Sequence, residues 1–430
     1  MKRLIFFLLS GIFIVSSSLF IYMYTNRYEV KTFEDEIDSK LFLKGVNDSK
    51  AIAKDDEGYL YIAFENEITK ITDEGEVIKS IKNREFSIDD IEIKEERIYI
   101  LSKDKLYSLN LDGDDKKEIV KDIPFGDDLD RKLLGKDGYI YLSIGTFTNS
   151  GIADESDFFE EKKKDLSPIE LKLRGINYGK KNTGAFKEFG DSSKEGEKIS
   201  KSKIGNASLI KIDVNKEEIE TFASGVKDIK GIDYKSNGEI YGVVSGMKNE
   251  GDRPVLRDSD YIYNLKEGSW YGWPDFSGGD PISSPRFTDN LKIENLLLNP
   301  PKENVDGPYY QHDSVNSIEC LAIDRDGILL EKDSILYYDS KTLELLSLNN
   351  KRELTKIIRL KEGNEIIDVL FLKDKCLLLE KENGVIYEIY NSNLISSKKV
   401  IPKAIIIIVV LITLMALVIV VNKILKRKYR

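Results

Sequence analysis

The chain has 430 residues, with 65 Lys or Arg, 75 Asp or Glu and a single His, for a formal net charge of −10. This acidic balance disfavours nucleic-acid binding, because a phosphate backbone requires a basic face. With His312 as the only histidine and two cysteines in all, His-rich and Cys-rich metal sites are excluded, as are most Ser-His-Asp triads unless His312 is the base.

The first predicted element is an apolar helix over residues 4–24, a run without a charged residue that follows Lys2 and Arg3. At ~1.5 Å per residue it is long enough to span a hydrocarbon layer of ~30 Å. A cleaved signal peptide has a similar beginning and is the alternative, but no A-x-A-like site follows the run. Residues 1–29 are therefore predicted to be an uncleaved signal-anchor transmembrane helix.

Residues 30–397 are predicted to form one all-β domain. An acidic or Asn residue followed by Gly and then an alternating strand recurs about six times between residues 45 and 392. Asp-Gly and Asn-Gly supply the positive φ angles of tight hairpins, and no crossover helices intervene. This pattern favours a six-bladed β-propeller, with a pair of β-sandwiches as the alternative. Examples are DEGYLYIAF from Asp56, KDGYIYLSIG from Lys136 and SNGEIYGVV from Ser236.

Two features interrupt or accompany these repeats. Residues 155–205, rich in Lys, Glu, Ser and Gly, are predicted to be a long inserted surface segment. Cys320 and Cys376 lie in apolar, strand-like runs, which favours buried thiols, although a disulfide is open to a protein outside the cell.

The last predicted element is a second transmembrane helix within residues 398–430. Residues 404–421 are apolar or nearly so, and a basic tail follows them. The positive-inside rule places both basic ends in the cytoplasm and the propeller outside the cell membrane. Setting aside the seven basic residues at the two ends leaves 58 of the 65 Lys and Arg against 75 Asp and Glu, so the outer domain is acidic.

Four passages in the middle of the chain resemble the glucose/sorbosone dehydrogenase family of bacterial propellers. The resemblance implies a six-bladed propeller that oxidises a sugar with pyrroloquinoline quinone (PQQ) and calcium. The Tyr-Gly-Trp-Pro motif in the last passage is the most specific. The passages are KDGYIYLSIGTFTNSGI at 136–152, TGAFKEFGDSSKEGEKI at 183–199, ASLIKIDVNKEEIETFASGVKDIKGIDY at 207–234 and GDRPVLRDSDYIYNLKEGSWYGWPDFSGGDPISSPRF at 251–287.

Three aromatic residues of the Tyr-Gly-Trp-Pro passage are candidates for a substrate pocket. In active relatives the tryptophan of this loop lies at the mouth of the central site, so the resemblance assigns Tyr271, Trp273 and Trp270 to a sugar pocket. Sugar C–H faces pack on aromatic rings, and neighbouring glycines let the backbone approach a ligand. The alternative is that both tryptophans cover a hydrophobic end of the propeller beneath a long loop.

The resemblance also bears on His312 and on an acidic run. His312 is similar to a histidine that lines the central opening in one branch of the family; a structural hydrogen-bonding role is the alternative. Asp258 and Asp260 match the acidic run just before the Tyr-Gly-Trp-Pro motif, which makes them the candidate calcium ligands, since calcium favours clustered oxygen atoms.

The chain departs from the family at two functional positions. Where active relatives carry a histidine as general base, this chain has Asp127 or Asp128, and an exposed aspartate with a pKa near ~4 is a weak base for a hydroxyl proton. The family's Arg-Asn-Pro turn, whose arginine approaches the quinone, begins here with Lys227 and Asp228. Lysine keeps the charge of arginine but lacks the planar fork that suits quinone carboxylates. Both departures favour altered or absent catalysis.

Three functions are compatible with these features. The first is a membrane-anchored, extracytoplasmic dehydrogenase of the PQQ type that oxidises a small sugar, with Lys227 and Asp228 at the cofactor. The second is a non-catalytic propeller that binds an envelope carbohydrate or a protein. The third is a structural or assembly role beside a membrane-protein partner, which the two predicted anchors would suit.

Overall fold

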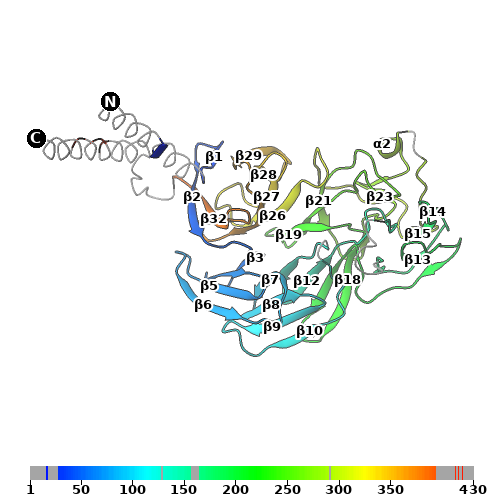
Figure 1. The fold of residues 1–430 in the computed structure, drawn as a ribbon, viewed down its shortest axis with the longest axis horizontal. Coiled ribbons are helices and arrows are strands. Elements are labelled where there is room, and N and C mark those ends of the chain that lie inside the picture. Colours follow the sequence, from blue (N-terminus) through cyan, green and yellow to red (C-terminus); the bar gives the residue numbers. More distant parts are fainter. Residues whose placement is uncertain are drawn as a thin grey trace, which may run out of the picture.

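The computed structural model describes residues 16–17, 28–126, 129–155, 164–289, 292–393, 412, 415 and 419. Six sheets of four or five strands are arranged around a central axis, so the predicted six-bladed propeller is confirmed (Figure 1). The predicted membrane segments, residues 4–24 and 404–421, lie almost entirely outside the described residues. Among the residues that are described, no helix is both long and apolar enough to cross a membrane.

The first three blades are formed by consecutive strands. Blade 1 contains β3 (Ala51–Lys54), β4 (Leu60–Ala63), β5 (Glu67–Ile71) and β6 (Val77–Lys82). Blade 2 contains β7 (Ile88–Lys94), β8 (Arg97–Ser102), β9 (Lys105–Asn110) and β10 (Lys117–Val120). Blade 3 contains β11 (Leu133–Lys136), β12 (Tyr139–Ile144), β17 (Ser208–Asp213) and β18 (Glu218–Ser224), with β22 (Ser269–Trp270) added in parallel.

The other three blades complete the ring. Blade 4 contains β19 (Ile229–Tyr234), β20 (Ile240–Val244), β21 (Tyr261–Leu265) and β25 (Tyr310–Gln311). Blade 5 contains β26 (Ile318–Asp324), β27 (Ser334–Asp339), β28 (Glu344–Leu348) and β29 (Leu354–Arg359), with β1 (Lys31–Thr32) at its edge. Blade 6 contains β30 (Ile366–Phe371), β31 (Lys375–Glu380), β32 (Val385–Asn391) and β2 (Ile37–Lys44).

The ring is closed by the first long strand of the chain. β2 pairs antiparallel with β32, so that Ile37 lies opposite Asn391 and Lys44 opposite Val385. Just beyond this pair, the Ser392 N–H donates to the Glu36 carbonyl at 2.7 Å. The pairing joins the two ends of the propeller and satisfies an edge that would otherwise be free to pair with another chain.

Local sequence explains the hairpins. In the turn between β11 and β12, Asp137 has φ +51° and Gly138 has φ +75°, which is the left-handed pair that a tight two-residue hairpin needs. The central strands of the blades are buried on both faces between neighbouring blades, as β20 and β27 show. Cys320 and Cys376 are buried free thiols within these packed strands, which confirms their predicted burial.

Buried aspartates tie the innermost strands together. Asp90 on β7 accepts from the Leu133 N–H of β11 at 2.7 Å. In the same way Asp233 on β19 accepts from β26, and Asp368 on β30 accepts from β3, at 2.8 Å and 3.0 Å. Because every innermost strand also contacts its two neighbours, these bonds cross alternate blade interfaces and hold the ring at a fixed diameter.

Long insertions in blades 3 and 4 form a cap at the end of the propeller where the innermost strands begin. The cap lies beside these blades, where α2 (Pro285–Thr288) and β23 (Phe276–Ser277) are labelled in Figure 1. Of the predicted insertion at 155–205, residues 164–205 belong to it, and Leu171, Leu173 and Phe186 are buried in its hydrophobic core. Its remaining short strands are β13 (Leu171–Lys172), β14 (Asn177–Tyr178), β15 (Thr183–Gly184), β16 (Lys198–Ile199) and β24 (Asp280–Pro281).

Candidate functional site

The residues predicted to approach a quinone are held in an internal ion pair. Lys227 and Asp228 lie just before β19, and both are buried. The Lys227 ammonium contacts the Asp228 carboxylate, which also accepts from the Thr146 N–H at 2.8 Å and from the Thr146 hydroxyl at 3.2 Å. Burial acts to raise the pKa of Asp228, but Lys227 and the Thr146 amide outweigh it and hold the pKa below its usual value. Lys227 is therefore neutralised by its own neighbour.

A second ion pair lies beside the first. The Lys230 ammonium is 3.0 Å from a carboxylate oxygen of Asp130 and 3.9 Å from one of Glu319. Burial acts to lower the pKa of Lys230, but the two carboxylates outweigh it, so the pKa is raised. These side chains come from the beginnings of β11, β19 and β26, so at this end of the axis the Lys230 ammonium is paired within the chain.

The predicted base residues, Asp127 and Asp128, lie outside the described residues. The residues that follow them are placed: Leu129 is buried, and Asp130 forms the pair with Lys230. The assignment of a base to this position stays a prediction.

The two tryptophans are core residues of the cap. Trp270 and Trp273 are each 5% exposed and belong to the cap core. Trp273 meets the Phe186 ring edge-on with centroids 5.7 Å apart and donates from Nε1 to the Asn149 carbonyl at 3.3 Å. Trp270 packs in the same manner on Phe276, also at 5.7 Å. Their positions agree with the alternative interpretation of the sequence, in which both tryptophans cover a hydrophobic end of the propeller beneath a long loop.

Tyr271 is also a buried structural residue. It is 3% exposed, and its hydroxyl donates to the Asn264 carbonyl at 2.7 Å and accepts from the Lys266 N–H at 2.8 Å. With Trp273 and Lys227, Tyr271 lines a void of only about 20 Å³. Since a water needs ~10–15 Å³, this void holds one water and no sugar ring. All three aromatics are thus packed in the cap, and the sugar pocket assigned to them stays a prediction.

Asp258 and Asp260 are surrounded by hydrogen-bond donors. Asp258 accepts from the Met247 N–H at 2.6 Å, the Tyr261 hydroxyl at 2.6 Å and the Ser277 hydroxyl at 2.8 Å. N–H and O–H hydrogens point at the oxygen atoms that a cation would need. Burial raises the pKa of Asp258, which also works against a charged ligand set.

The acceptor positions of the Asp260 carboxylate are also occupied, by backbone N–H groups of two loops. Its donors are Gly246 at 3.1 Å, Asn316 at 2.9 Å, Ser317 at 2.7 Å and Ile318 at 3.0 Å. The calcium site predicted at these two residues does not fit the donors around them. No group of three or more His, Cys, Asp or Glu side chains elsewhere in the described residues could hold a metal ion.

His312 packs between two tyrosines at the beginning of blade 5. It is 7% exposed, its ring lies 6.0 Å from that of Tyr337, and its Nε2 is 3.5 Å from Asp339. Burial acts to raise the pKa of Asp339, but contacts from His312 and Thr342 hold it below the usual value. The position favours the structural alternative over a lining residue of a central opening.

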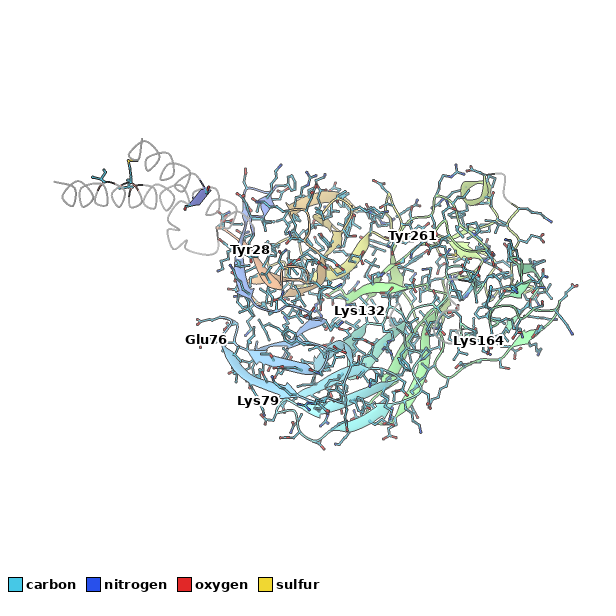
Figure 2. The ribbon with its side chains drawn as sticks, viewed as in Figure 1. Tyr28, Glu76, Lys79, Lys132, Lys164 and Tyr261 are labelled. Atoms are coloured by element: carbon cyan, nitrogen blue, oxygen red, sulfur yellow. The ribbon has the colours of Figure 1, made fainter. Side chains whose placement is uncertain are left out.

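A cavity that sequence reasoning missed lies along the propeller axis. Its volume is about 210 Å³, and residues of all six innermost strands line it. Figure 2 places Lys132 near the centre of the propeller, where these strands converge. One sequence pattern could have indicated this cavity, namely charged residues inside otherwise apolar strands. Examples are IDDIEI at 88–93 and IIDVLF at 366–371. The charged lining residues are Lys54, Asp55, Asp56, Asp90, Glu92, Lys94, Lys132, Lys230, Asp233, Arg325 and Asp368.

Comparison with known proteins supports the fold. No protein-family model and no curated protein sequence matches the chain. Among solved structures, the holo PQQ domain of pyranose dehydrogenase from Coprinopsis cinerea has 11% identity and a TM-score of 0.57, covering 85% of this chain and 97% of that one. The calcium structure of a Trichoderma reesei protein of Carbohydrate-Active Enzymes Family AA12 has 13% identity and a TM-score of 0.59, covering 85% and 98%.

A bacterial structure gives the same result. The PQQ-bound aldose sugar dehydrogenase from Streptomyces coelicolor has 12% identity and a TM-score of 0.52, covering 83% of this chain and 99% of that one. At such identities the likeness concerns the fold, and residues such as Lys227 and Asp228 must be judged on their own contacts. The resemblance seen in the sequence is thus confirmed at the level of architecture: this chain is a six-bladed β-propeller with the fold of the PQQ-dependent sugar dehydrogenases.

Proposed function

We propose that this chain is a membrane-tethered propeller that binds a sugar or an envelope carbohydrate without oxidising it through PQQ. The sugar assignment is supported by the fold it shares with a pyranose dehydrogenase and an aldose sugar dehydrogenase. The main observation against PQQ-dependent oxidation is the ion pair between Lys227 and Asp228. The alternative, PQQ-dependent oxidation of a sugar, is tested by the same experiments.

The residues at the predicted cofactor position do not fit PQQ. The cofactor carries three carboxylates, which require cations that are free to pair with them. Here Lys227 and Lys230 are each paired with an aspartate of the chain, and the void beside Lys227 is water-sized. A bound quinone would have to displace both pairs and leave Asp228 and Asp130 facing its own negative charge.

The first test is a titration of the full-length, detergent-solubilised protein with PQQ in the presence of calcium. Trp273 lines the void beside Lys227, so its fluorescence would report a quinone at that position. We expect no saturable quenching at micromolar PQQ. Saturable quenching that disappears in Lys227→Ala would overturn the proposal and restore the dehydrogenase alternative.

Sugar binding is tested separately by isothermal titration calorimetry with D-glucose, D-galactose and D-mannose. We expect saturable binding of at least one of them to the wild-type protein. A flat response to all three would contradict the sugar assignment and direct the search to protein partners, including a neighbouring membrane protein.

The membrane tether is supported by where the propeller ends. The Ser392 N–H bonds the Glu36 carbonyl beside the β2–β32 pair of blade 6, and β1 pairs with β29 of the adjacent blade 5, so both flanking segments leave the propeller from neighbouring blades and can enter one bilayer. We propose that both termini are cytoplasmic and that the propeller is extracellular, in accord with the basic residues at both ends of the sequence.

Protease treatment of intact cells that express the protein tests this topology. We expect the propeller to be degraded while tags at both termini stay protected. Alkaline carbonate should leave the protein in the membrane fraction, and its release there, or a tag that is digested, would contradict the double anchor.

A further inference from the structure

We propose that the axial cavity is the sugar-binding site and that it is entered where the innermost strands end, opposite the cap. This inference rests on the proposed function and names its site. The cavity contains Lys54, Lys94, Tyr234 and Phe371, the last residues of four innermost strands, and it reaches the surface at the exposed Asp56. At the other end Lys230 lines the cavity and is paired with Asp130, just before the neighbouring strand β11.

Lys132 supplies a free donor in the lining of the cavity. Within the described part of the chain its ammonium makes no hydrogen bond or ion pair, although it lines the cavity. Burial acts to lower the pKa of Lys132, but Asp90 and Asp368 outweigh it and raise the pKa, so the group is charged. Three N–H hydrogens of one ammonium can donate to the hydroxyls of a ligand.

Acceptors surround this donor at fixed positions. Asp90 takes backbone N–H bonds from Ile91 and Leu133, at 3.0 Å and 2.7 Å. Asp368 takes the same two kinds of bond, from Val369 at 2.9 Å and Ile52 at 3.0 Å. Each carboxylate has about four acceptor positions, so each keeps some for a ligand hydroxyl while the backbone bonds hold it in place.

The balance of charge favours an uncharged ligand. The lining has five cations and six acids, and burial raises the pKa of Glu92 to about 8 and that of Asp90 to about 6, and also raises those of Asp233 and Asp368. At neutral pH Glu92 is therefore mostly protonated, and the lining has no large excess of negative charge. A neutral molecule with many hydroxyls satisfies donors and acceptors of both kinds without adding charge, whereas a polyanion such as PQQ would be repelled by the acids.

Size and the shape of the mouth fit a monosaccharide. At ~30 Å³ for each water in the liquid, the cavity volume of about 210 Å³ corresponds to about seven waters, which leaves room for one small polyol such as a single monosaccharide ring. At the mouth the Arg325 guanidinium stacks on Tyr234, 4.1 Å from the ring centroid, and lies 3.6 Å from Asp233. This stack gives the entrance a flat, polar wall.

Gly135 lets two lining side chains approach the backbone of β11 closely. It lines the cavity, and a Cβ there would lie 3.1 Å from Glu92 Cγ and 3.2 Å from Lys94 Cβ, so both side chains would have to move. Its backbone lies outside the positive-φ region, so a larger residue can be introduced without strain on the main chain. A Gly135→Leu substitution would therefore push Glu92 and Lys94 aside and reduce the free space of the cavity.

The test is calorimetric titration of the full-length protein with the same three hexoses and a set of matched variants. Lys132→Met removes the central donor, and Gly135→Leu removes space; each is expected to weaken binding by about ten-fold or more. Lys79→Met on the outer strand β6 is the matched control, and it should bind as the wild type does. Thermal unfolding of each variant establishes that it is folded.

The outcomes separate this inference from the proposed function. Loss of binding in folded Lys132→Met and Gly135→Leu, with retention in Lys227→Met at the capped end, is the expected result. Wild-type affinity in both cavity variants, or loss only in Lys227→Met, would overturn the axial site while sugar binding itself stands. If the wild-type protein binds none of the hexoses, the proposed function fails and the inference fails with it.

Discussion

Replacement of Arg253 by Ala is expected to lower the free energy of unfolding by about 3–5 kcal/mol, the cost of breaking a buried ion pair. Arg253 is completely buried in the cap, where its guanidinium lies 2.7 Å from Asp275. It also donates to the carbonyls of Ser150, Pro274 and Glu294, at 2.7 Å, 2.9 Å and 2.9 Å. One side chain thus joins three insertions of the cap. Without it, the Asp275 carboxylate would stay buried with no cation beside it.

Urea unfolding of the full-length protein, followed by tryptophan fluorescence, measures this effect, because Trp270 and Trp273 both lie in the cap core. Arg257→Ala is the matched control. Its guanidinium pairs with Asp289 on the surface, where both side chains are more than half exposed, and its loss should cost about 0–1 kcal/mol. Equal effects of the two substitutions would show that the cap does not depend on its buried arginine.

Asp260→Asn is expected to be nearly as disruptive, with a loss of about 3 kcal/mol. Each hydrogen bond to a charged acceptor contributes ~1.5–3 kcal/mol, and Asp260 accepts four of them from backbone N–H groups. The asparagine would remove the charge and turn an amide N–H₂ toward some of these donors. The loops at the ends of blades 4 and 5 would lose the group that joins them.

The same unfolding measurement, repeated with millimolar calcium, tests the calcium assignment. We expect calcium to leave the midpoint of the wild-type protein unchanged, since donors already fill both carboxylates. Asp112→Asn, at a side chain that is 77% exposed, should be nearly neutral. A calcium-dependent rise in stability that is lost in Asp260→Asn would restore the metal site at Asp258 and Asp260.

These expectations concern residues whose roles the sequence left open. The motif around Trp270 and Trp273 led to the right fold, but its aromatic residues fit a pocket wall and a hydrophobic core equally well in a linear sequence. The choice between the two depends on Phe186, which lies 87 residues before Trp273 and packs against it. The role of a carboxylate such as Asp260 is equally ambiguous in the sequence. Its hydrogen-bond donors, at 246 and 316–318, come from two separate loops on either side of it in the chain.

What the sequence by itself determined is the repeated blade. Positive φ at residues such as Asp137 and Gly138, and the period of two in the strands, are local properties, so hairpins can be read from a few neighbouring residues. The pairing of Lys230 with Asp130, the packing of the cap and the axial cavity were decided only by the tertiary structure. Charge neutralisation, burial and enclosed volume are sums over segments from all six blades, and no local pattern contains them.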